Sequence, residues 1–252
     1  MPHTATHSVP APVAPLAQVP FDHRIVANEY GFYCVPKSYM QREVPQVLAR
    51  GAVYEPDTLR FMARILARGG DIICGGAFVG DFFPALSQAL TPGAMLHSFE
   101  PNPIARDAAS HTMLLNTLDN VALYPCAVGA GTGTLNLQVT RPNGEAMAAR
   151  AKIVETAAEG QTIEIPVCRI DDLVDRARQI TLLQLDIEGH EPKALEGAVD
   201  TVRTWRPYIL VEAERPAKQR RIARLLAQLC PQADYTPAGI IERNTIYLPR
   251  SP

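Results

Sequence analysis

The 252-residue sequence lacks three features that would each point to a class of protein: a surplus of positive charge, a long apolar run and closely spaced cysteine pairs. Its formal net charge is -2, whereas a nucleic-acid-binding domain usually carries a basic surplus clustered on one face. No apolar stretch approaches the roughly 20 residues that a membrane-spanning helix needs. The composition therefore argues against nucleic acid as a partner and against a membrane span.

The cysteines are odd in number, lie far apart and form no C-x-x-C pair; they are Cys34, Cys74, Cys126, Cys168 and Cys230. This spacing disfavours both a disulfide framework and a structural zinc site, so we expect reduced, mostly buried thiols in a cytoplasmic protein. Residues 1–20 are rich in proline and alanine but lack the basic start and unbroken apolar core of a secretory signal. We interpret them as a flexible leader.

Hydrophobic residues make up 47% of the chain, which is enough for one large α/β domain or at most two small ones. From about residue 57, short apolar runs alternate with segments of helical periodicity. The expected strands span 71–76, 94–100, 121–129, 163–170, 180–186 and 208–214, and the expected helices span 80–90, 102–118, 171–177, 191–205 and 216–229. This alternation predicts a Rossmann-like, doubly wound, mostly parallel α/β sheet. Two short final strands, 238–240 and 244–249, predict an antiparallel hairpin at one edge.

Three motifs follow three of these strands: CGGAFVG at 74–80, FEPN at 99–102 and DIEGHE at 186–191. The carboxyl ends of parallel strands meet at one edge of the sheet, where ligands bind. The glycines of the first motif allow a ligand to approach the backbone closely, but they fit neither the G-x-G-x-x-G dinucleotide fingerprint nor the P-loop. Glu100 ends the next strand about 20 residues later, which is where a carboxylate binds ribose hydroxyls in such folds.

Taken in order, the motifs of this chain resemble those of the FkbM-type family of class I S-adenosylmethionine-dependent methyltransferases. The similarity runs through GGAFVGDF, FEPNP, AVG, VCRIDDL, LLQLDIEGHE, ALEGA and RPYILVE. It implies a methyltransferase catalytic domain over 57–252 that contains a variable loop at 141–161. The segment 21–56 before it is expected to form a lid, a homodimer contact or part of the substrate site.

The resemblance implies S-adenosylmethionine as the cofactor. Gly76, Ala77, Phe78 and Gly80 are expected at the methionine and sulfonium end, and Glu100 is expected at the ribose. Pro101 and Asn102 are expected beside the adenine, with Cys126 and Ala127 over the base. Asp186 is expected to face the sulfonium, and Asp81 is a further expected cofactor contact. Two positions depart from the family pattern, because Cys74 stands where the family usually has Asp and Gln184 stands where Lys is common.

The expected reaction transfers a methyl group to a hydroxyl of a small molecule, a sugar or a glycoconjugate. It needs an in-line arrangement of oxygen, carbon and sulfur and a group that takes the hydroxyl proton. We assign Asp186 and Glu188 to acceptor orientation or proton removal, with His190 as a further candidate because an unperturbed imidazole pKa is about 6.5. Glu191 is interpreted as an acid at a helix start. The carboxylates of Asp186, Glu188 and Glu212 permit Mg²⁺ without demanding it.

The acceptor pocket is expected from segments 21–56 and 141–161. Aromatic residues in the first segment either stack on a ring substrate or form a packed lid or dimer contact; they are Tyr30, Phe32, Tyr33, Tyr39 and Tyr54. Two other functions stay open. One is an inactive methyltransferase-like binding protein, which the presence of Cys74 in place of Asp supports. The other is a nucleotide-dependent oxidoreductase, which the incomplete glycine fingerprint disfavours.

Overall fold

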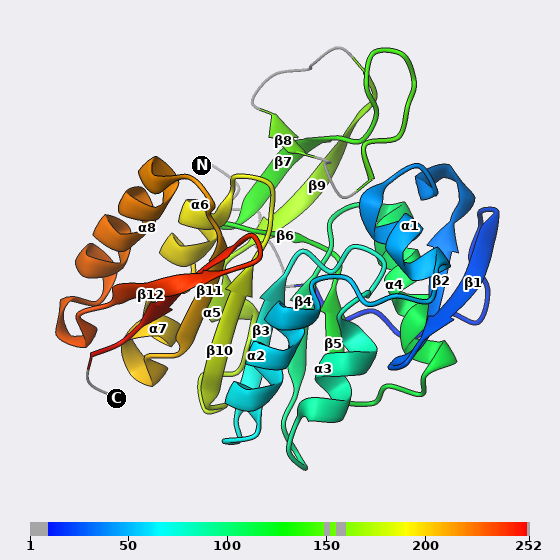
Figure 1. Cartoon of the computed structure of the whole chain (residues 1–252). Helices are drawn as coiled ribbons and strands as arrows, with labels where there is room; N and C mark the ends of the chain where they lie inside the picture. The colour runs from blue at the N-terminus through cyan, green and yellow to red at the C-terminus, as the bar shows by residue number, and fades with distance from the viewer. Residues whose placement is uncertain (1–9, 149–151, 155–159, 251–252) are drawn as a thin grey trace.

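A seven-stranded sheet forms the centre of the computed structural model, which describes residues 10–148, 152–154 and 160–250 (Figure 1). Its strands, in spatial order, are β12 (Thr236–Ile241), β13 (Asn244–Leu248), β11 (Tyr208–Glu212), β10 (Ile180–Leu185), β3 (Asp71–Gly75), β4 (Leu96–Phe99) and β5 (Val121–Tyr124). The strands from β11 to β5 run parallel, whereas β13 is antiparallel to both β11 and β12. The predicted mostly parallel sheet with an antiparallel edge hairpin is confirmed.

Helices cover both faces of this sheet. One face packs against α2 (Pro56–Leu66), α3 (Phe83–Ala89) and α4 (Pro103–Leu115), and the other against α5 (Ile170–Leu173), α6 (Glu191–Glu196), α7 (Val199–Trp205), α8 (Pro216–Leu229) and the short η3 (Pro231–Ala233). Successive strand residues point to opposite faces, so Ile72 joins the first core and Ile73 the second. The sheet is therefore doubly wound, as predicted. In the described part of the chain, every helix is too short or too polar to cross a membrane.

A second, four-stranded sheet contains β6 (Ala127–Val128), β9 (Thr162–Cys168), β7 (Gly133–Gln138) and β8 (Lys152–Val154), in that order. The prediction of one strand over 121–129 is wrong, because β5 and β6 belong to different sheets and Pro125 between them has no N–H for a ladder. The predicted loop 141–161 contains β8, which pairs with β7. Residues 149–151 and 155–159 of that loop lie outside the described residues.

The N-terminal segment is built onto α4. It contains the hairpin β1 (His23–Asn28) and β2 (Gly31–Pro36), followed by η1 (Lys37–Tyr39) and α1 (Glu43–Ala49). The backbone N–H of Cys34 donates to Thr112 Oγ1 at 3.0 Å. Within the expected flexible leader, the N–H of Val13 donates to the Leu123 carbonyl of β5 at 2.7 Å. That part of the leader is docked on the sheet edge, and residues 1–9 lie outside the described residues.

The predicted continuous helix over 191–205 is two helices, α6 and α7, with Gly197 at the break. A Cβ atom on Gly197 would lie 2.0 Å from the Gly129 carbonyl oxygen, so the two backbones are in direct contact. Close packing of the helix break against the loop after β6 therefore requires glycine at this position.

We expect Gly197→Ala to lower the free energy of unfolding by about 1–3 kcal/mol, because the added methyl group must displace backbone rather than a flexible side chain. Urea denaturation measures the change. Gly131→Ala is the matched control, since a Cβ there has no atom within 4 Å, and its effect should stay below about 0.5 kcal/mol. Equal effects of the two variants would contradict the packing argument.

Candidate functional site

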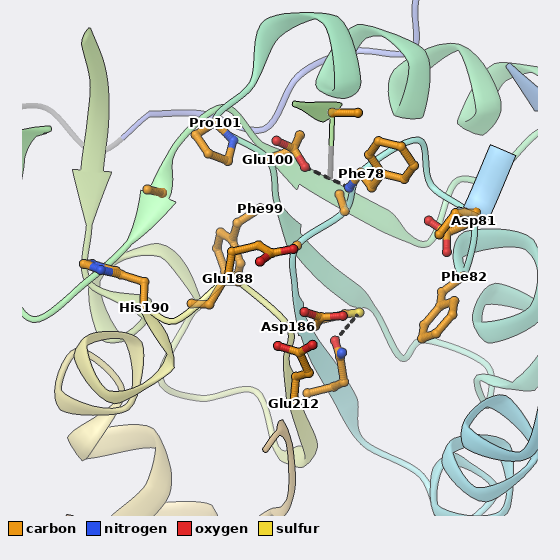
Figure 2. Close-up of a pocket in the computed structure, with 18 of the residues that line it drawn as sticks. Phe78, Asp81, Phe82, Phe99, Glu100, Pro101, Asp186, Glu188, His190 and Glu212 are labelled. Atoms are coloured by element: carbon orange, nitrogen blue, oxygen red, sulfur yellow. Dashed lines mark hydrogen bonds between the residues drawn. The ribbon is translucent and has the colours of Figure 1, made fainter. Parts of the chain in front are cut away.

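A cavity of about 460 Å³ lies at the carboxyl ends of β3, β4, β10 and β11. Its volume is in the range of small-molecule binding sites. The inner wall comes from the loops that follow these strands, and the outer wall comes from α1, the chain after β7, and β8. Figure 2 shows the carboxylates of Glu100, Glu188 and Asp186 directed into this space. The motifs that follow three separate strands therefore meet in one cavity.

The turn after β3 depends on a glycine. Gly76 has a φ of +90°, and a Cβ atom on it would lie 2.1 Å from the Asp186 carbonyl oxygen. Glycine is therefore required both by the backbone conformation and by the close approach of the loop after β10. This contact sets the turn carrying Ala77 and Phe78 directly beside the acidic loop.

Glu100, at the end of β4, is 8% exposed and is held by backbone donors. Its Oε2 accepts a hydrogen bond from the N–H of Phe78 at 2.8 Å, and its Oε1 accepts one from the N–H of Asn102 at 2.9 Å. Burial raises the pKa of the carboxyl to about 7, while the two N–H groups oppose that rise. Each oxygen keeps a further lone pair, so the carboxylate can still accept hydrogen bonds from a ligand.

The part of the cavity around Asp186 is rich in carboxylates and has few cations near them. Asp186 has a pKa raised well above its usual value, first by burial and then by the negative charges of Glu212 and Glu188. Burial also raises the pKa of Asp81 to about 7. His190 responds in the opposite direction, because burial lowers its pKa and keeps the imidazole neutral. A cation entering this cavity would therefore be favoured, and a neutral imidazole is present to accept a proton.

Glu191 holds the acidic loop in shape. The side chain is fully buried, and its Oε1 accepts hydrogen bonds from the N–H groups of Ile187 at 3.3 Å and Gly189 at 3.0 Å. Its Oε2 lies 3.3 Å from Lys218 Nζ, which also contacts Glu212 Oε2 at 3.4 Å. The sequence interpretation of Glu191 as only a helix-start acid misses this role, because the spacing does not reveal which backbone groups a carboxylate reaches.

The two positions that depart from the family pattern contact each other. Cys74 and Gln184 are register partners on β3 and β10, and the Cys74 thiol donates to Gln184 Oε1 at 2.9 Å. Both residues are neutral, both are at most 4% exposed and both line the cavity. The departures therefore form one matched pair rather than two separate losses.

Adjacent residues at the start of α1 tie the outer wall to the rest of the protein. Arg42 Nη2 lies 3.1 Å from Glu145 Oε1 in the chain after β7. Glu43 Oε2 accepts a hydrogen bond from Arg243 Nη2, between β12 and β13, at 2.9 Å. No motif in the sequence indicated these residues, because they come from three distant segments and contact each other only in the fold.

Comparison with known proteins identifies the family. The model of the methyltransferase FkbM domain matches residues 74–236, which is more than half of the chain. The chain belongs to the FkbM methyltransferase family. A comparison with curated protein sequences gave no match.

Solved structures agree on the class I methyltransferase fold. The FkbM methyltransferase of Methylobacillus flagellatus KT is 19% identical, with a TM-score of 0.51, and the match covers 71% of this chain and 43% of that one. TYW2 of M. jannaschii, solved in complex with AdoMet, is 11% identical with a TM-score of 0.51, and the match covers 92% and 87%. The match therefore extends over less than half of the M. flagellatus protein.

In this FkbM methyltransferase, most of the predicted site residues line the cavity: Gly76, Ala77, Phe78, Asp81, Glu100, Pro101, Cys126, Ala127, Asp186, Glu188, His190 and Glu212. Two do not. Gly80 packs against the ring of Phe83, and Asn102 caps the N-terminus of α4 by accepting from the N–H of Ile104. The Asn102 amide also donates to the Tyr39 hydroxyl.

Aromatic residues of the N-terminal segment mostly serve packing. Tyr39 stacks on Phe78 with ring centroids 5.6 Å apart, and Tyr33 is fully buried, whereas Tyr54 lines the cavity. The structure does not bring Asp186, Glu188 and Glu212 together as a cation site. Among the described residues, no group of three or more His, Cys, Asp or Glu side chains is arranged to hold a metal ion.

We expect Glu191→Ala to destabilise the protein by about 2–3 kcal/mol, because two loop N–H groups lose their acceptor and the ion pair with Lys218 is broken. Glu191→Gln keeps an acceptor oxygen and should cost about 1 kcal/mol. Guanidinium denaturation of both variants measures the difference. If Ala and Gln are equally harmful, the charge of Glu191 matters rather than the hydrogen bonds to the loop.

Proposed function

We propose that this member of the FkbM family is an S-adenosylmethionine-dependent O-methyltransferase whose acceptor is a hydroxyl of a small molecule, a sugar or a glycoconjugate. One observation carries the proposal: a carboxylate fixed by two backbone N–H groups, Glu100, shares a cavity with the acidic wall around Asp186 and Glu188. The first offers hydrogen-bond acceptors to a ribose, and the second offers negative charge to a sulfonium cation.

The residues present fit the groups that this cofactor carries. Phe99, Pro101 and Ala127 offer apolar surface beside Glu100 for an adenine ring. Among the described residues, no hydrogen-bond donor reaches the Asp186 carboxylate, so a nearby cation would offset the cost of its burial. When bound, S-adenosylmethionine supplies a methyl group on a positively charged sulfur, which makes that carbon electrophilic. The AdoMet in the structure of M. jannaschii TYW2 supports the same choice of cofactor.

We assign acceptor handling to the loop after β10. Glu188 or Asp186 accepts the hydrogen bond of the acceptor hydroxyl and so fixes its oxygen for in-line attack. His190, kept neutral by burial, is suited to take the proton that leaves the hydroxyl. The outer wall around Arg42 and Arg243 lines the same space. All five cysteines are free and buried, which supports a reducing, cytoplasmic location.

We expect Glu100→Gln to weaken binding of S-adenosylhomocysteine by about 1.5–3 kcal/mol, because the ribose hydroxyls lose a charged acceptor. Isothermal titration calorimetry measures the affinity, and the unfolding temperature shows whether the variant is folded. Glu164→Gln, an exposed carboxylate on β9, is the matched control and should bind like the wild type. Absence of binding heat with the wild-type protein would refute the proposed cofactor.

We expect the preference for S-adenosylmethionine over S-adenosylhomocysteine to increase with pH. Asp186 has a raised pKa in the free protein, so at low pH it is protonated and offers a sulfonium no charge. A bound cation favours the ionised form, so binding releases a proton and tightens as pH rises through that raised pKa. Both ligands share the ammonium and carboxylate, and therefore the ratio of their dissociation constants isolates the sulfonium.

This ratio is measured from about pH 5.5 to about pH 8.5 in the wild type and in Asp186→Asn. The Asn variant should give a ratio that changes little with pH, because it has no carboxyl group to ionise. An equally steep pH dependence in Asp186→Asn would assign the effect to another acid, such as Asp81, whose pKa burial raises to about 7.

A further inference from the structure

Two neutral side chains form the inner end of the cavity, on the main sheet itself. Cys74 is 3% exposed and Gln184 is 4% exposed, and both line the cavity. The thiol of Cys74 donates to Gln184 Oε1 at 2.9 Å, and the two residues are paired across adjacent parallel strands. The strands restrict both backbones, so this hydrogen bond fixes which end of the Gln184 amide points away from Cys74.

The amide nitrogen of Gln184 is consequently left as a donor toward the cavity. With Oε1 occupied by the thiol, Nε2 carries two N–H groups, and among the described residues it has no hydrogen-bond partner. Because Gln184 lines the cavity, this donor is accessible to a bound ligand. An oxygen atom of a bound ligand would satisfy it.

The surrounding charges indicate which oxygen that is. Asp81, Asp186 and Glu212 line the cavity and, when ionised, act only as acceptors, so they suit the ammonium group of an amino acid. A carboxylate needs donors instead, and the two lining arginines are paired with Glu145 and Glu43. Gln184 is a buried donor next to the Gly76 turn, where the methionine end of the cofactor is expected.

We propose that Gln184 binds the carboxylate of the methionine part of S-adenosylmethionine through Nε2, and that Cys74 orients the amide for this contact. The inference rests on the proposed function, because it assumes that this cofactor occupies the cavity. It adds a binding residue for the amino-acid part, and it gives the pair that departs from the family pattern a role in cofactor affinity. The contact is a hydrogen bond to a charged group, which is stronger than one between neutral groups.

The test compares two ligands that differ in the amino-acid part. Calorimetry measures binding of S-adenosylhomocysteine and of 5′-methylthioadenosine, which has no amino-acid part, to the wild type and to Gln184→Met. The Met variant keeps the size of the side chain and removes the donor. We expect it to weaken S-adenosylhomocysteine binding by about 10- to 100-fold and to leave 5′-methylthioadenosine binding within about 2-fold of wild type.

Cys74→Ala serves as the second variant, because it frees the amide without removing it. We expect it to weaken S-adenosylhomocysteine binding by about 2- to 5-fold, again with little effect on 5′-methylthioadenosine. A third ligand, S-adenosylhomocysteine without its carboxylate, should bind equally to the wild type and Gln184→Met. Equal binding of this ligand assigns the contact to the carboxylate rather than to the ammonium.

Three results would overturn the inference. Gln184→Met could weaken binding of S-adenosylhomocysteine and of 5′-methylthioadenosine equally, which would mean that Gln184 supports the shape of the cavity. It could weaken neither, or it could weaken the decarboxylated ligand as much as S-adenosylhomocysteine. Failure of the wild type to bind either adenosine ligand would instead refute the proposed function itself, whereas 5′-methylthioadenosine binding that Glu100→Gln weakens would keep the cofactor assignment intact.

Discussion

Backbone N–H groups at the strand ends must find acceptors, and in this protein buried carboxylates supply them. Glu100 accepts from one N–H in the turn after β3 and one at the start of α4. Glu191 accepts from two N–H groups of the loop after β10. Loops at the carboxyl edge of a parallel sheet have no ladder partner, so each would otherwise carry unpaired buried donors. These two carboxylates therefore hold two of the loops that form the inner wall of the cavity.

The use of carboxylates to hold these loops gives the cavity an excess of negative charge. Carboxylates that hold loops cannot move away, and the neighbouring Asp186 and Asp81 share their poorly solvated surroundings, which raises their pKa values. In the free protein these acids oppose folding as pH rises from their usual pKa toward the raised value, because the unfolded chain ionises in this range while the native state still holds the protons. A bound cation favours the ionised acids and so removes this loss of stability. The buried, closely spaced acids therefore cause both the affinity for a sulfonium and the lower stability of the free protein.

The sequence predicts the sheet and the inner wall because both depend on local patterns. Apolar runs mark the strands, and Gly76, Glu100 and Asp186 follow strands whose carboxyl ends meet at one edge. The outer wall is different, because the pair Arg42–Glu145 and the pair Glu43–Arg243 join residues about 100 and 200 positions apart. No spacing rule connects such residues. Asn102 shows what a motif position alone does not reveal, since a residue expected beside the cofactor caps a helix.

The pair Cys74 and Gln184 shows why positions that differ from a family pattern must be judged together. An Asp at position 74 would add a buried anion to a cavity that already holds Asp81, Asp186 and Glu212. That single change would be costly in a site that is already short of positive charge, unless a cation at the adjacent position 184 came with it. A thiol and an amide avoid that cost while they keep a hydrogen bond between β3 and β10. Two departures that look like decay when each is considered alone are therefore compatible with an intact cofactor site.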